Sequence, residues 1–79
     1  MKAKVYSSGD YAVIESKNFK AYYGYEVTNE DDDWCFEARF EDEVIIIPFS
    51  KLGTDDKFNC VENLMKGIAW LFMKYKLTL

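Results

Sequence analysis

Histidine is absent from this chain of 79 residues, and the absence narrows the chemistry open to it. Imidazole is the commonest general base and metal ligand at neutral pH, so neither cysteine has the usual partner that would activate it as a nucleophile. No G-x-S-x-G, P-loop or G-x-G-x-x-G motif occurs either. The sequence therefore predicts a protein without enzymatic activity, with no catalytic residue and no cofactor.

The sequence also lacks a complete metal-binding motif. Asn29, Asp31 and Asp33 have the spacing of the first three ligands of a calcium loop. The pattern then fails, because Trp34 stands where the loop requires glycine and Phe40 where it requires a bidentate glutamate. We therefore expect no metal site.

Long apolar runs and a secretory leader are missing as well. We therefore expect a cytoplasmic protein (host cytoplasm if it is viral) that neither binds nor spans a membrane. Two cysteines in such a chain, Cys35 and Cys60, favour reduced, buried thiols over a disulfide. The length predicts one small globular domain over residues 1–79, and 49% hydrophobic with 18% aromatic residues excludes disorder.

Alternating apolar residues and turn residues divide the first fifty positions into short strands. Turn sequences lie at 7–10, 16–18, 28–33 and 41–43. Between them the pattern predicts five strands of an antiparallel meander, at 2–6, 11–15, 19–27, 34–40 and 44–49. Pro48 near the end of the last strand indicates a strand terminus or a sheet edge, because proline cannot donate to the ladder.

A helix is predicted to begin between Asp55 and Asn59 and to end near Tyr75. Asn59 and Glu62 fit a capping box at its start. Gly67 is the one weak position unless a close neighbour needs its bare backbone. The residues expected to face the core are Val61, Leu64, Met65, Ile68, Leu71, Phe72 and Tyr75. The predicted fold is α+β, with the C-terminal helix packed on one face of the five-stranded sheet.

Four consecutive β-branched residues, Val44 to Ile47, make both faces of the last strand apolar. A helix about 10–12 Å wide covers only two or three strands spaced at about 4.8 Å. Three explanations for the second sheet face stay open: the sheet curls over itself, a second copy stacks on it, or a different molecule binds there. A related feature lies on the helix, where Trp70, Met73 and Leu77 have the spacing of a contact face opposite the expected core stripe.

Acidic residues are concentrated in one part of the chain. Residues 26–43 contain nine acids and Arg39 alone, a charge of −8, whereas the remaining residues sum to +4. This distribution disfavours direct binding of nucleic acid. The acids could serve solubility only, or they could mimic nucleic-acid phosphates in a basic groove of another protein. The predicted partner-binding residues are Glu30, Asp31, Asp32, Asp33, Trp34, Glu41, Asp42, Glu43, Trp70, Met73 and Leu77.

These features favour a small acidic protein–protein interaction module, an inhibitor or adaptor that occupies the surface of a larger protein, which could itself bind nucleic acid. In size and composition the chain resembles phage-encoded inhibitors of host defence, including anti-CRISPR and anti-restriction proteins, although no motif supports the likeness. The alternative is a self-associating, homodimeric structural or accessory domain without enzymatic activity. A third possibility is a pocket for a small apolar ligand between sheet and helix.

Overall fold

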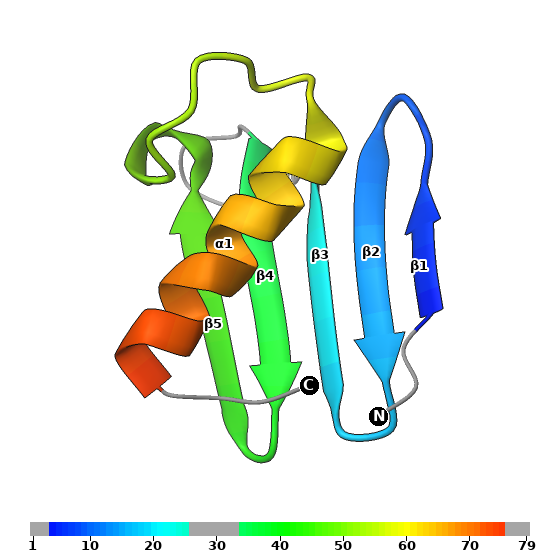
Figure 1. Cartoon of the computed structure of the whole chain (residues 1–79), viewed down its shortest axis with the longest axis vertical. Helices are drawn as coiled ribbons and strands as arrows, with labels where there is room; N and C mark the ends of the chain where they lie inside the picture. The colour runs from blue at the N-terminus through cyan, green and yellow to red at the C-terminus, as the bar shows by residue number, and fades with distance from the viewer. Residues whose placement is uncertain (1–3, 26–33, 76–79) are drawn as a thin grey trace.

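The computed structural model describes residues 4–25 and 34–75 and confirms the predicted α+β fold (Figure 1). Five strands form one antiparallel sheet in chain order, and a short 3-10 helix and one α-helix follow. The elements are β1 (Lys4–Ser7), β2 (Tyr11–Ser16), β3 (Phe19–Tyr25), β4 (Trp34–Phe40), β5 (Glu43–Pro48), η1 (Phe49–Lys51) and α1 (Cys60–Tyr75). Strand β5 is an edge strand, which confirms the interpretation of Pro48.

Short turns set the register of the sheet. Ser7 pairs with Ala12 across the first turn, where the Ser8 amide donates to the Tyr11 carbonyl at 2.8 Å. Two-residue turns join β2 to β3 and β4 to β5. As a result, side chains in register form rows that cross all five strands, and alternate residues of each strand face α1.

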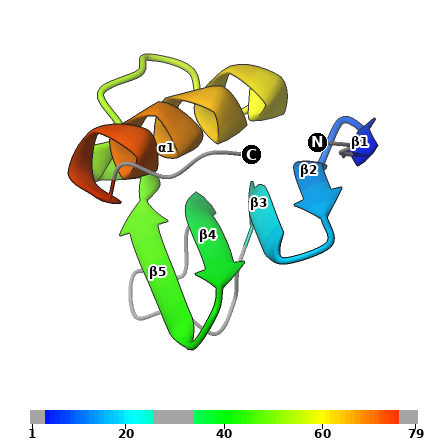
Figure 2. The same cartoon turned by 60° about the horizontal axis from the view of Figure 1, so that its bottom comes forward.

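Helix α1 lies diagonally across one face of the sheet and packs on β2, β3 and β4 (Figure 1). Strand β1 stands clear of it (Figure 2), and Val5 of β1 is 64% exposed. The single helix therefore covers three strands, which is the number that its width of about 10–12 Å allows. The core between helix and sheet is built from Ala12, Ile14, Phe19, Ala21, Tyr23, Phe36, Ala38, Phe40, Ile47, Cys60, Leu64, Ile68 and Leu71.

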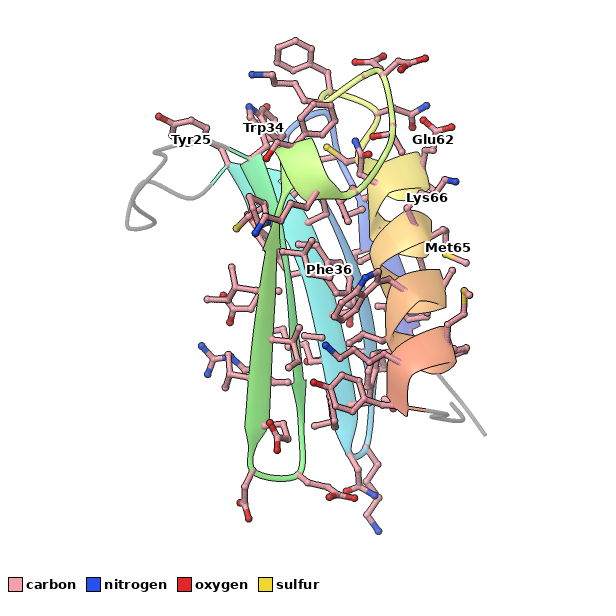
Figure 3. All side chains as sticks on the ribbon, turned by 90° about the vertical axis from the view of Figure 1, so that its left-hand side faces the viewer. Tyr25, Trp34, Phe36, Glu62, Met65 and Lys66 are labelled. Carbon is pink, nitrogen blue, oxygen red and sulfur yellow. The ribbon has the colours of Figure 1, made fainter. Side chains whose placement is uncertain are left out.

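Small residues let the helix approach the sheet closely. Ala21 and Ala38, paired across β3 and β4, are fully buried on the helix face. On the helix, a Cβ at Gly67 would lie closer than 3.0 Å to three atoms of the Phe36 ring. Figure 3 shows Phe36 pointing from the sheet toward α1. The close approach of the Phe36 ring therefore requires a residue without a Cβ at this position, and this explains the glycine inside the helix.

The helix is rotated about its axis from the orientation that the apolar pattern predicted. Val61, Met65 and Tyr75, expected in the core, are 49%, 53% and 37% exposed, and Figure 3 shows Met65 on the side away from the sheet. Leu64, Ile68 and Leu71 are buried as predicted, and Phe72 packs partly buried against the core. The buried stripe also contains Cys60, Asn63 and Gly67, which the pattern did not predict. The prediction was wrong for Val61, Met65 and Tyr75, because hydrophobicity alone gives no reason to bury an asparagine and a glycine in their place. Asn63 is hydrogen-bonded to the loop before the helix, and Gly67 lies against the Phe36 ring.

The sheet face turned away from α1, called the open face below, keeps apolar side chains in contact with solvent. Ile45 and Ile47 pack on the helix side, whereas Val44 and Ile46 point to the open face and are 52% and 55% exposed. Within residues 4–25 and 34–75, no helix or strand covers this face. The residues in register on it are Lys4, Tyr6, Tyr11, Val13, Glu15, Lys20, Tyr22, Gly24, Cys35, Glu37, Arg39, Val44, Ile46 and Pro48.

Candidate functional site

Three aromatic side chains gather at one end of the sheet, where β3 ends and β4 begins. The Trp34 ring forms edge contacts with Tyr25 and Phe58, with ring centroids 6.1 and 5.5 Å apart. Its face stacks on the buried ring of Tyr23 at 5.9 Å. Figure 3 shows Tyr25 and Trp34 at this end of the molecule, beside the loop that leads to α1. We call Tyr25, Trp34 and Phe58 the aromatic end.

The outer members of the aromatic end are accessible. Phe58 is 65% exposed and Tyr25 is 45% exposed, while Trp34 is half-buried between them. An exposed phenylalanine on a loop contributes little to the stability of the fold, since most of its apolar surface stays in water. Clusters of aromatic side chains of this kind are typical of anchors in protein–protein interfaces.

The loop that carries Phe58 is fixed by a buried asparagine. Asn63 is fully buried, and its side-chain amide donates to the Asp56 carbonyl at 2.8 Å. The Thr54 hydroxyl donates to its side-chain oxygen. One side chain of the helix thus holds two positions of the loop, and both polar groups of Asn63 are satisfied. A buried amide bonded in this way rigidifies its neighbours, because breaking either bond would leave an unpaired polar group.

Further hydrogen bonds hold the same loop at both ends. The Asp56 carboxylate accepts from the Phe58 amide at 2.9 Å, and the Tyr23 hydroxyl donates to the Lys57 carbonyl at 2.7 Å. The Asn59 side chain accepts from the Glu62 amide at 3.2 Å, which confirms Asn59 as the cap of α1. Phe58 is therefore an exposed apolar side chain on a well-anchored backbone.

Charges around the aromatic end are mainly acidic. Asp55 and Asp56 are exposed on the loop that carries Phe58, and the half-buried Lys57 lies between Asp56 and Phe58 in sequence. Glu30, Asp31, Asp32 and Asp33, which directly precede Trp34, lie outside the described residues, as does the calcium-like triplet of Asn29, Asp31 and Asp33. In sequence, five acids separate Tyr25 from Trp34. The aromatic end therefore combines apolar anchors with a local excess of negative charge.

The second acidic group lies elsewhere. Glu41, Asp42 and Glu43 are exposed at the β4–β5 turn, at the opposite end of β4 from Trp34. A strand of seven residues separates the two ends by about 20 Å. Within the described residues, the structure thus brings Trp34 together with Asp55 and Asp56 rather than with the acids of the β4–β5 turn.

The predicted helical contact residues lie on the surface of α1. Trp70 is 38% exposed at the flank of the buried stripe, and the Lys74 ammonium lies 4.9 Å from its ring centroid. Met73 is 84% exposed, and Leu77 lies outside the described residues. The exposed Trp70 and Met73 are thus available to a partner, but they lie on the helix and not at the aromatic end.

Neither cysteine forms a reactive site in this structure. Cys35 and Cys60 are both buried and are not joined by a disulfide, as predicted. Burial raises the pKa of the Cys60 thiol, and the carboxylates of Asp10 and Asp56 raise it further. Cys60 is therefore less nucleophilic than an exposed cysteine at neutral pH. Within residues 4–25 and 34–75, no three histidine, cysteine, aspartate or glutamate side chains gather at one point where they could hold a metal ion.

Sequence reasoning missed Tyr25 and Phe58 as members of the site. Tyr25 has the parity of a core residue in β3, and Phe58 lies in a polar stretch without periodicity. A signal for Phe58 does exist, because it follows Asp56 by two residues, the spacing of a turn in which an aspartate accepts from the backbone.

Comparison with known proteins gives no match: no family model, no curated protein and no solved structure is significantly similar to the chain. In the part of the chain that the structure describes, no helix has the length and apolar character needed to cross a bilayer.

Proposed function

We propose that this chain is a small binding protein that occupies a surface of a larger, basic protein through its aromatic end. Tyr25, Trp34 and Phe58 would enter an apolar pocket of the partner, and the neighbouring acids would pair with its cations. In this account the chain performs no chemistry and acts as an inhibitor or adaptor in the cytoplasm. The phage-encoded inhibitors that it resembles in size and composition act in this general way.

One observation carries the proposal: Phe58 is 65% exposed on a loop held by the buried amide of Asn63 and the buried hydroxyl of Tyr23. Fixing an exposed apolar side chain before binding lowers the entropy lost when a partner immobilises it. Stability alone does not account for the exposed ring. A role as a pre-ordered binding anchor does account for the exposed ring, because an apolar side chain surrounded by acids suits a partner with an apolar pocket and a basic rim.

Charge and apolar contact would act on different steps of association. The excess of acids over residues 26–43 would speed the encounter with a basic surface, and this effect weakens with salt. Burial of the aromatic rings would slow dissociation. Reversing the charges of Asp31, Asp32 and Asp33 should therefore flatten the salt dependence of the association rate, while removing Phe58 should raise the dissociation rate.

The test is quantitative capture from extracts of the native cell. Immobilised wild-type chain, Phe58→Ala and Met65→Ala would be compared by mass spectrometry. Met65 is the matched control, since it is 53% exposed on the outer side of α1 (Figure 3). A hot-spot loss of about 2 kcal/mol corresponds to roughly 30-fold weaker binding, so one partner should be lost with Phe58→Ala and kept with Met65→Ala. Equal recovery of every captured protein by all three chains would refute the proposal.

A further inference from the structure

The open face carries two separate apolar patches at its opposite edges. Tyr6 and Tyr11 are 44% and 38% exposed and border a shallow depression that Val13 and Tyr22 also line. We call Tyr6, Tyr11 and Tyr22 the tyrosine patch. Val44 and Ile46, the β5 patch, are 52% and 55% exposed.

The floor between these two patches includes an ion pair and a glycine covered by a tyrosine ring. Arg39 donates to Glu37 at 2.7 Å on β4. On β3, a Cβ at Gly24 would lie closer than 3.0 Å to the Tyr22 side chain, so the Tyr22 ring lies along its own strand over this glycine. The Tyr11 ring is nearly parallel to it, at an interplanar angle of 17°. The tyrosine patch is thus a low, broad surface that another flat surface can cover.

We propose that a second copy of this chain covers the open face, with a two-fold axis that lies between the two sheets, parallel to the strands and over β3. Such an axis places β3 on β3, β2 on β4 and β1 on β5 of the second copy. This symmetry brings Tyr6, at the edge of each tyrosine patch, onto Ile46 of the β5 patch of the other copy, and it sets Tyr22 on the central strand opposite Tyr22 of that copy. Two aligned sheets of this kind form a sandwich with about 10 Å between them.

The register makes one apolar contact specific, in a row that also sets Glu37 opposite Val13 of the second copy, an unfavourable contact. Tyr6, Val13, Tyr22, Glu37 and Ile46 form one row across the sheet. The axis therefore sets Tyr6 opposite Ile46 of the second copy, and the reverse contact occurs at the other edge. An aromatic ring against a β-branched side chain is a favourable pair in sheet packing.

The charged row is complementary under the same symmetry. Lys4, Glu15, Lys20, Arg39 and Val44 are in register in the next row. Glu15 of one copy then faces Arg39 of the other, and the axis creates this ion pair twice. Lys20 faces its own equivalent, an unfavourable contact. This row lies next to the turns at the end of the sheet, however, where a lysine side chain can extend its ammonium into solvent.

The available area indicates a weak dimer. Five strands at about 4.8 Å and strand lengths near 20 Å give at most roughly 450–500 Å² of face per copy, or about 1,000 Å² in total. Val13, Gly24 and Cys35 on this face are already buried in the single chain, so the area left for a second copy is smaller. Even the maximum is at the lower limit for a specific interface, below the roughly 1,600 Å² of a standard one. We therefore expect a dissociation constant in the micromolar range rather than an obligate dimer.

Sedimentation velocity between about 1 µM and 1 mM protein, in the range where a weak interface dissociates, tests the proposal with two matched variants. Ile46→Lys alters the β5 patch, and lysine is tolerated on an edge strand. Met65→Lys makes the same change on α1, at a side chain of nearly equal exposure. We expect dimerisation of the wild type and of Met65→Lys, and at least a tenfold rise in the dissociation constant for Ile46→Lys. Thermal unfolding would show that both variants stay folded.

Cross-linking tests the register itself. Lys4 and Val44 lie on opposite edge strands, about 19 Å apart in one copy by strand spacing, yet face each other across the proposed axis. A mixture of Lys4→Cys and Val44→Cys chains, treated with a short bismaleimide, should give more mixed than self cross-linked product. A chain that stays monomeric at every concentration, equal weakening by both lysine variants, or no excess of mixed product would each overturn the proposal.

Discussion

Replacing Gly67 by alanine tests whether the helix seats on the sheet as the structure has it. In an open helix interior this change stabilises a protein by about 1 kcal/mol, because glycine loses more backbone entropy on folding. Here the new methyl group would lie closer than 3.0 Å to three atoms of the Phe36 ring, which is fully buried. The ring would have to retreat by about 1 Å to restore contacts of 3.5–4.0 Å.

The packing cost should exceed the gain in propensity. Overpacking of a core costs about 1–3 kcal/mol, and an enclosed aromatic ring belongs at the upper end of that range. We expect Gly67→Ala to lower the free energy of unfolding by about 2 kcal/mol, and the midpoint by about 8–16 °C for a domain of this size. Thermal and denaturant unfolding followed by circular dichroism measure both quantities.

A second substitution makes the reasoning specific to this contact. Phe36→Leu removes the ring face that meets Gly67, so Gly67→Ala should cost much less in that background. A coupling energy of at least 1 kcal/mol in the double-mutant cycle is expected, because the two residues touch. Stabilisation by Gly67→Ala in the wild-type background would refute the packing described above.

Three other substitutions or conditions probe separate features of the fold. Asn63→Asp should cost about 3 kcal/mol at pH 7 and less near pH 4, because a buried carboxylate cannot donate to the Asp56 carbonyl; a pH-independent loss measured by urea unfolding would argue against that hydrogen bond. Glu41 has a φ of 53°, so Glu41→Gly should raise the free energy of unfolding by up to about 1 kcal/mol, and a lower unfolding midpoint would contradict this. The raised pKa of Cys60 favours the neutral thiol in the folded state, so the free energy of unfolding should fall as pH rises above about 8.5, the pKa of an unfolded cysteine. Cys60→Ser should abolish that part of the pH dependence of stability, and an unchanged profile would count against the raised pKa.

Local patterns were sufficient to predict the strands, because each one is short, alternating and bounded by turn residues. Phe19, Ala21 and Tyr23 alternate with polar or exposed neighbours, and the structure places all three in the core. The predicted start of the helix was also confirmed at Asn59. These features depend on sequence neighbours only, which is why periodicity and capping rules find them.

The rotation of the helix depends on contacts between distant residues, and the sequence pattern could not supply them. Asn63 is buried because Thr54 and Asp56 lie where its amide reaches them. Val61 and Met65 are as apolar as the true core residues, so a helical wheel assigns them to the core. The exposure of Phe58 has a similar origin, since only the folded loop shows that its ring extends past Trp34.

The apolar second face of the sheet, by contrast, followed directly from four β-branched residues in succession. Val44 and Ile46 are exposed on the open face as the alternation requires. The cross-linking experiment tests whether a second copy covers that face in the proposed register.

The proposed binding mode requires Phe58 to be held in place before any partner arrives, and the backbone order of the free protein tests this requirement most directly. Amide ¹⁵N relaxation of residues 54–59 should give order parameters near 0.85, the value of rigid backbone, because Asn63, Tyr23 and Asp56 anchor that loop. Order parameters below about 0.6 in the isolated wild-type chain would contradict the account, since the phenyl group would then be exposed merely because its loop is mobile.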